Sequence, residues 1–226
     1  TADTHFDVIS RPVELPDSTG WVEEAFGTHP LQTFACLESG GETFAVLPQG
    51  LFEFEAREDD ASTLSLTLLR ACRIKLAVSE EKLTELPDEG IQCPGRQVFR
   101  YALVAAGGDW KSNVLLQQAD DAAHPVRAIM TGRGKGSLPA EQSLFCIANS
   151  AVHVSAVKQA EDGEGLIIRL FNPTDEPQEV PVTFGKTIFE AKRCGMDESV
   201  LEPLSVDGAK VAITVAPRKI YTLCVR

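Results

Sequence analysis

The sequence predicts an all-β protein built from stacked antiparallel sheets, a β-sandwich or supersandwich with at most one or two short helices. Short segments rich in β-branched and aromatic residues follow one another and are separated by Gly, Pro, Asp and Ser, as is typical of strands and turns. Residues 64–68 alternate leucine with Ser or Thr, which places three leucines on one face of a strand. Helical periodicity is rare. We therefore expect sheets that bury one face against each other.

Ten segments carry the strand pattern. In chain order they are residues 33–37, 43–47, 51–56, 62–69, 98–104, 152–157, 166–171, 179–184, 210–215 and 219–225. The clearest local unit spans residues 143–169, where an apolar segment, the polar turn Glu-Asp-Gly-Glu-Gly and a second apolar segment predict a β-hairpin. Residues 111–123 have a helical pattern that His124-Pro125 ends, and residues 79–86 form a weaker second helix candidate.

A boundary is predicted at residues 131–137, Thr-Gly-Arg-Gly-Lys-Gly-Ser, because alternating glycines and two cations cannot build a core. This loop lacks the Gly-x-x-x-x-Gly-Lys-Ser/Thr spacing that cradles a phosphate, so we interpret it as a crossover. We expect residues 1–130 to form a large β-supersandwich portion. Residues 131–226 then form a smaller C-terminal β-sandwich portion.

Composition narrows the possible partners. Of the 226 residues, 43% are hydrophobic and 24% are charged, as in ordinary soluble domains. The formal net charge of -12 disfavours nucleic acids and anionic membranes, whereas a neutral sugar would not be repelled. No apolar run approaches the roughly 18 residues of a membrane span, and no signal segment is recognisable. The chain begins Thr-Ala-Asp rather than with Met, which we interpret as a piece of a longer protein.

The six cysteines show no Cys-x-x-Cys pair or other close spacing that would indicate a zinc site. Several lie within apolar runs, such as Cys146 between Phe145 and Ile147, where a free thiol packs as a small hydrophobic group. We interpret them as reduced core residues of a cytoplasmic protein. Their even number also allows a disulfide framework.

Several short motifs occur in a fixed order along the chain. They include Gly50-Leu-Phe-Glu-Phe-Glu55, Gly90-Ile-Gln-Cys-Pro-Gly95, Gly108-Asp-Trp110 and Ile220-Tyr-Thr-Leu223, with Ser-Ala-Val-Lys and Arg-Leu-Phe-Asn in the predicted hairpin. In this order they resemble the C-terminal β region of family 38 glycoside hydrolases of bacterial type, the α-mannosidases. The resemblance covers nearly the whole chain. It implies the accessory half of an enzyme of carbohydrate metabolism rather than its catalytic half.

Members of this family carry an upstream α/β catalytic domain and a helical bundle. They are retaining α-mannosidases that use zinc or another divalent metal, an Asp nucleophile and a second carboxylic acid. The resemblance therefore implies that this chain has no cofactor, no metal ligand and no catalytic residue of its own. The His5-x-Asp7 spacing matches a metal motif of the family, but it continues into β sequence, so we interpret it as strand residues.

Glu53 and Glu55 are candidate functional residues. They alternate with Phe52 and Phe54, so their carboxylates should share one face of a strand. Paired carboxylates can serve acid/base chemistry or bind sugar hydroxyls. The alternative is an ordinary solvated strand face. If they are functional, we expect them to border the active site of the parent enzyme.

Exposed aromatic rings are common sugar contacts, which makes Trp21, Trp110, Tyr101 and Tyr221 candidates. Trp110 follows a Gly-Gly-Asp sequence that would suit an exposed loop tip, but core packing is the interpretation we favour for any one of these rings. His29 lies shortly after Trp21 and two glutamates. The candidates for pocket-bordering or sugar-binding residues are therefore Glu53, Glu55, Trp21, His29 and Trp110.

The leading hypothesis is a non-catalytic C-terminal β region of a retaining, metal-dependent cytoplasmic α-mannosidase. It would be inactive alone, pack on the upstream catalytic domain of the same polypeptide and border the site where the parent binds its α-mannoside substrate. A second hypothesis is an independent carbohydrate-binding β-sandwich module, since a fold does not fix a function. A third makes the region an oligomerisation surface of a homo-oligomer.

Overall fold

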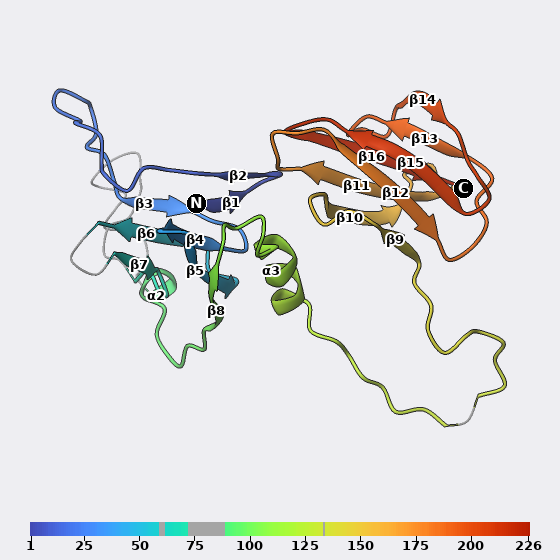
Figure 1. Cartoon of the computed structure of the whole chain (residues 1–226). Helices are drawn as coiled ribbons and strands as arrows, with labels where there is room; N and C mark the ends of the chain where they lie inside the picture. Colours follow the sequence, from blue (N-terminus) through green and yellow to red (C-terminus); the bar gives the residue numbers. More distant parts are fainter. Residues whose placement is uncertain (59–61, 72–88, 133) are drawn as a thin grey trace.

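The computed structural model describes residues 1–58, 62–71, 89–132 and 134–226. They form two β bodies, which we call the N-terminal body (within residues 1–123) and the C-terminal body (residues 145–226). An extended segment joins the two bodies (Figure 1). Each body contains two antiparallel sheets. The prediction of an all-β protein of stacked antiparallel sheets is therefore confirmed.

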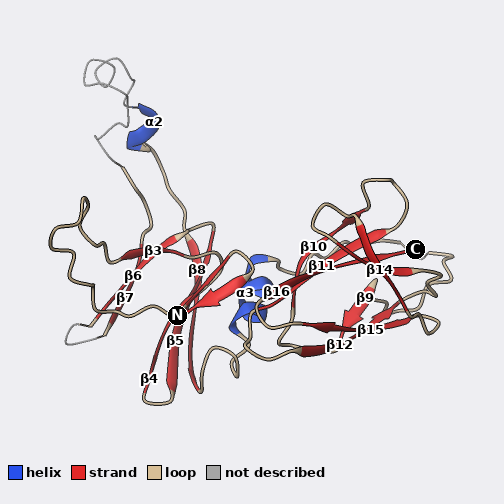
Figure 2. Cartoon of the chain, turned by 90° about the horizontal axis from the view of Figure 1, so that it is seen from above, coloured by secondary structure: helices blue, strands red, loops and turns tan. Residues whose placement is uncertain are grey.

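The N-terminal body stacks a five-stranded sheet of order β2-β1-β4-β5-β8 on a three-stranded sheet of order β3-β6-β7 (Figure 2). The strands are β1 (Ala2–Thr4), β2 (Asp7–Ile9), β3 (Thr28–Pro30), β4 (Ala35–Ser39), β5 (Glu42–Gln49), β6 (Glu53–Arg57), β7 (Thr63–Leu66) and β8 (Arg100–Gly107). Phe54 of β6 packs between the sheets with Leu31, Ala35 and Val46. The side chains of Phe54, Leu31 and Val46 each contribute about 1.5–3 kcal/mol through burial.

The other face of the five-stranded sheet carries helix α3 (Leu115–Ala123), whose buried Leu115, Leu116 and Ala119 pack against strand residues such as Cys36 and Leu47. The predicted start at residue 111 is wrong by four residues. The Asp109 side chain accepts hydrogen bonds from the backbone and hydroxyl of Ser112, which closes a turn before the helix. Helix α2 (Glu89–Gln92) is a single turn, and the candidate helix at 79–86 lies outside the described residues.

The C-terminal body stacks a five-stranded sheet of order β10-β11-β16-β13-β14 on a three-stranded sheet of order β15-β12-β9. The strands are β9 (Phe145–Ile147), β10 (His153–Gln159), β11 (Leu166–Asn172), β12 (Gln178–Phe184), β13 (Ala191–Cys194), β14 (Val200–Leu204), β15 (Lys210–Val215) and β16 (Lys219–Val225). Fourteen buried residues, including Ile168, Leu170 and Leu223, form its core. This core draws only on residues of the C-terminal body.

The predicted hairpin is confirmed, because β10 pairs with β11 in antiparallel register. Gly165 in its turn has φ +116, and a Cβ there would lie 2.7 Å from the carbonyl oxygen of Val225. Only glycine therefore fits this close approach. All ten predicted strands overlap observed strands, whereas β1, β3, β13 and β14 were not predicted. β2 begins at Asp7, which we interpreted as a strand residue, and β9 lies within the first apolar segment of the predicted hairpin. The predicted crossover at 131–137 falls in the segment between α3 and β9, and the division at residue 130 stays a prediction.

The interpretation of the cysteines as core residues holds for Cys36, Cys194 and Cys224, which are buried. It is wrong for Cys146, which is exposed. Phe145 and Ile147, on either side of it in β9, pack against the core, so the alternation of a strand turns Cys146 outward. The five cysteines among the described residues are free thiols.

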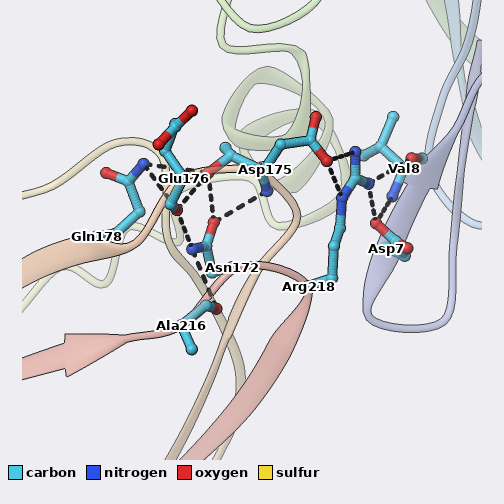
Figure 3. Close-up of polar contacts among 9 residues, drawn as sticks. Asp7, Val8, Asn172, Asp175, Glu176, Gln178, Ala216 and Arg218 are labelled. Atoms are coloured by element: carbon cyan, nitrogen blue, oxygen red, sulfur yellow. Dashed lines mark hydrogen bonds and ion pairs between the residues drawn. The ribbon is translucent and has the colours of Figure 1, made fainter.

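The two bodies meet around Arg218, which precedes β16 (Figure 3). Its guanidinium forms ion pairs with Asp7 of β2 and Asp175, and it donates a hydrogen bond to the carbonyl of Val8 over 3.0 Å. The bond from Arg218 holds the pKa of the Asp175 carboxyl below its usual value. Arg218 thus links the β1–β2 hairpin to the C-terminal body.

Asn172, at the end of β11, is fully buried beside this contact (Figure 3). Its side-chain amide donates to the carbonyls of Glu176, Val215 and Ala216, and its side-chain oxygen accepts from the backbone and hydroxyl of Thr174. A single side chain therefore satisfies the polar groups of two neighbouring turns.

Candidate functional site

Glu53 and Glu55 of β6 lie on the outer face of the three-stranded sheet. Phe54 between them is 3% exposed and points into the body, so strand alternation turns both carboxylates outward. Across the ladder, Glu55 is paired with Thr28 of β3 and with Ser65 of β7. The two carboxylates therefore share one face, as their alternation with phenylalanine indicated.

The contacts of the two carboxylates differ. Glu53 accepts a hydrogen bond of 2.8 Å from the hydroxyl of Thr67 and lies 3.6 Å from the guanidinium of Arg70, an exposed pair worth little energy. Glu55 lies against Gly27, where an added Cβ would come within 2.8 Å of a carboxylate oxygen. Gly27 thus allows the preceding loop to approach Glu55. This face offers acceptors for the hydroxyl groups of a sugar.

His29 does not join the carboxylates. It is paired with Phe54, so its side chain lies on the opposite face of the sheet, with its ring 5.9 Å from the Phe54 ring. Burial, and to a lesser extent the charge of Arg11, lowers its pKa. Trp21 lies in the long loop between β2 and β3, where it is 59% exposed. Of the five candidates, the structure places only the two glutamates on one surface.

Trp110 lies apart from the other candidates, on the side of the five-stranded sheet that carries α3. Its ring packs 6.2 Å from the ring of Phe34, and its backbone N–H donates to the Glu38 carboxylate over 2.8 Å. The interpretation as an exposed loop tip is therefore wrong, and the favoured interpretation of core packing is correct for this residue. Helix α3 covers the sheet at this point, which the Gly-Gly-Asp sequence did not reveal.

The interpretation of the His5-x-Asp7 motif as strand residues is correct for Asp7, which begins β2, and wrong for His5, which lies in the turn before it. Thr4 is paired with Asp7, so His5 and Phe6 connect β1 to β2, and Phe6 has φ 63. His5 is exposed, while Asp7 is engaged by Arg218. Among the described residues, no group of three or more His, Cys, Asp or Glu side chains is arranged to hold a metal ion. The parts of the chain that can be described contain no helix long and apolar enough to cross a membrane.

The sequence interpretation missed the apolar strip on β8. Tyr101 was considered as a sugar contact, but it lies beside Leu103 and Ala105 on one exposed strand face. The signal was present in the sequence, since residues 101–106 are apolar without interruption. Such runs are typical of strands covered on both faces.

His153 begins β10 beside the junction of the bodies, with its ring 5.7 Å from the ring of Phe171. It lines a small cavity of about 60 Å³ together with Trp110 and Lys111. Burial lowers its pKa from 6.5 to about 4. In the unfolded chain the imidazole binds a proton near pH 6.5, whereas in the folded chain it does so only near pH 4.

We therefore expect the protein to lose about 2 kcal/mol of stability between pH 7 and pH 5 through His153, because the unfolded state binds the extra proton over this range. Urea unfolding at a series of pH values measures the effect. His153→Phe should remove this part of the pH dependence, while His5→Phe controls for the loss of an exposed histidine. An unchanged pH profile for His153→Phe would contradict the assignment.

The described residues form an all-β region of two bodies, each made of two stacked sheets, with paired outward carboxylates on β6. Residues 151–223 match the glycosyl hydrolases family 38 C-terminal beta sandwich domain. The resemblance to the C-terminal β region of family 38 glycoside hydrolases, which the ordered motifs indicated, is confirmed by this match.

The similar proteins are much longer than this chain. "Putative mannosylglycerate hydrolase" from Halalkalibacterium halodurans (strain ATCC BAA-125 / DSM 18197 / FERM 7344 / JCM 9153 / C-125) is 30% identical over 223 residues, which are 98% of this chain and 23% of that protein. The crystal structure of an α-mannosidase from Enterococcus faecalis V583 matches 99% of this chain and 24% of its own, with 23% identity and a TM-score of 0.74. A family 38 glycosyl hydrolase structure from Enterococcus faecalis matches 87% of this chain and 22% of its own, with 22% identity and a TM-score of 0.69. The two structures share the fold, and the chain spans about a quarter of the length of each relative.

Proposed function

We propose that this chain is the non-catalytic C-terminal β region of a retaining, metal-dependent α-mannosidase. The observation that carries the proposal is the match of residues 151–223 to a C-terminal domain of family 38, in a chain that aligns with 23% of a longer relative. The chemistry of glycoside hydrolysis then belongs to the remainder of the parent polypeptide. Free cysteines among the described residues fit a cytoplasmic location.

The residues described here do not fit a zinc site of their own. His5 is exposed on a turn, and Asp7 is occupied by Arg218. In this proposal zinc, or another divalent metal, is bound by the upstream catalytic domain of the parent. The β region binds that domain and supports its shape. Glu53 and Glu55 are the residues we propose for contacts with the α-mannoside, because their carboxylates share one outward face of β6. Trp21 is a further candidate, since its ring is exposed in the loop between β2 and β3.

We expect the isolated chain to release no aryl alcohol from an aryl α-mannoside in the presence of zinc, and the full-length parent to release it. Mannosylglycerate serves as a second substrate, since one relative is named for its hydrolysis. In the same assay, Glu55→Gln in the parent should raise KM about tenfold, because one charged hydrogen bond to the substrate is lost. Glu179→Gln, on the exposed face of β12, is the matched control.

Turnover by the isolated chain, or a parent that hydrolyses neither substrate, would overturn the proposed function. Equal KM values for Glu55→Gln, Glu179→Gln and the unmodified parent would overturn only the pocket-bordering role. Binding of a mannoside by the isolated chain would instead favour an independent carbohydrate-binding module.

A further inference from the structure

Strand β8 is apolar on both faces, but only one face is covered. Val104 packs on the side of α3, within the core that contains Leu115 and Leu116. On the opposite face, Tyr101 and Leu103 are 52% and 60% exposed. An uninterrupted apolar strand is expected where both faces are buried. In the described structure, nothing packs on the face of β8 that carries Tyr101 and Leu103.

The covering sheet β3-β6-β7 ends halfway across this face. Val46 of β5 lies beneath it and is 5% exposed, whereas Leu103, its direct partner on β8, lies beyond it. The uncovered surface continues along the five-stranded sheet through Ala105, its partner Phe44, and Leu37, which pairs with Phe44. We call Leu37, Phe44, Tyr101, Leu103 and Ala105 the β8 strip. It is one contiguous apolar surface on three neighbouring strands.

The backbone of β8 is also open. β8 ends its sheet, and within the described ranges no strand pairs with its outer edge. Edge strands are often protected by charged or proline residues, but β8 carries only Arg100, at its first position, and residues 101–107 contain neither. An apolar strip beside an open edge marks an interaction surface.

We propose that the β8 strip and the free edge of β8 dock the part of the same polypeptide that precedes this chain in the parent enzyme. The inference rests on the proposed function and adds the face that is used. The relative that aligns with 98% of this chain is more than four times as long, so a large occupant is available. A segment of the same polypeptide is present at high effective concentration and outcompetes a second copy.

The first test compares amide hydrogen exchange in the isolated chain and in the full-length parent. Amides of residues 100–107 whose N–H groups face the outer edge of β8 should exchange at least about tenfold more slowly in the parent, because an added strand or layer protects them. Amides of β14, an edge strand of the C-terminal body, should exchange at similar rates in both proteins.

The second test uses Leu103→Asp and a matched control. Leu201→Asp changes a leucine of β14 that is 58% exposed, against 60% for Leu103, and both lie on edge strands. In the isolated chain neither substitution should shift the unfolding midpoint, because both side chains are exposed there. In the parent, Leu103→Asp should raise the exchange of β8 amides about tenfold, and Leu201→Asp should not.

Equal β8 exchange in the parent and the isolated chain would overturn the docking. Sedimentation of the isolated chain as a dimer that Leu103→Asp dissociates would overturn the proposed occupant in favour of a second copy. Protection of β8 in a parent that hydrolyses no α-mannoside would support the docking while refuting the proposed activity. Exchange reports docking independently of turnover, so the two failures are distinguishable.

Discussion

Replacing Asn172 with alanine should lower the free energy of unfolding of the C-terminal body by about 3 kcal/mol, because several buried polar groups lose their partner at once. The side chain is fully buried and makes five hydrogen bonds, with donor–acceptor distances between 2.7 and 3.2 Å. Alanine leaves the carbonyls of Val215 and Ala216 without this donor and the Thr174 backbone N–H without its acceptor. The bonds to Val215 and Thr174 are buried, so these groups have no ready replacement for the lost partner.

Urea unfolding of the isolated chain, followed by circular dichroism, measures this effect. Asn149→Ala is the matched control, since Asn149 also bridges turns of the C-terminal body but is only half-buried. Water can replace its partners, so we expect a loss of about 1 kcal/mol. Equal losses for the two variants would show that burial of the Asn172 network contributes nothing beyond an ordinary hydrogen bond.

Replacing Asp3 with alanine should destabilise the N-terminal body by about 3 kcal/mol or more, since bonds to a charged acceptor are individually stronger. The carboxylate of Asp3 is buried and accepts hydrogen bonds from the backbone N–H groups of Gln32, Thr33 and Phe34, at 2.8 to 3.0 Å. The hydroxyl of Thr33 donates a fourth bond over 2.6 Å. Alanine leaves the buried backbone N–H of Phe34 and the partly buried N–H groups of Gln32 and Thr33 without this acceptor.

Tryptophan fluorescence isolates this effect, because Trp21 and Trp110 are the only tryptophans of the chain and both lie in the N-terminal body. Asp3→Ala should lower the urea midpoint of the fluorescence transition, and Asp3→Asn should lower it less because one acceptor remains. The control is Asp17→Ala, which removes an exposed carboxylate bonded to Thr19. If the urea midpoints of Asp3→Ala and Asp17→Ala are equal, the proposed role of Asp3 is contradicted.

The local sequence pattern predicted the strands whose buried side chains are apolar. The strands it missed are short and depend on distant partners. β1 is Ala-Asp-Thr, which has no strand pattern, and Asp3 holds it in place through residues about thirty positions away. β14 is mostly exposed and includes a proline, so its pairing with β13 left no alternation to detect.

For the candidate site, too, the sequence predicted the features that depend on one strand and missed those that depend on contacts between elements. The shared face of Glu53 and Glu55 follows from the period of two within a strand. The opposite placement of His29 depends on the register between β3 and β6, which no local pattern contains. Trp110 is covered because α3 folds back over the sheet, a contact that only the tertiary structure provides.

The self-contained core of the C-terminal body has a consequence for biosynthesis. Its sheets contain only residues from 145 onward. Once these residues have left the ribosome, the body can fold without contacts to any earlier segment. The N-terminal body emerges before them, and under the docking proposed above its exposed β8 face would meet a domain that has already been translated. Synthesis from the N-terminus would then allow the β8 strip to be covered during translation, when exposed apolar edges of nascent chains can aggregate.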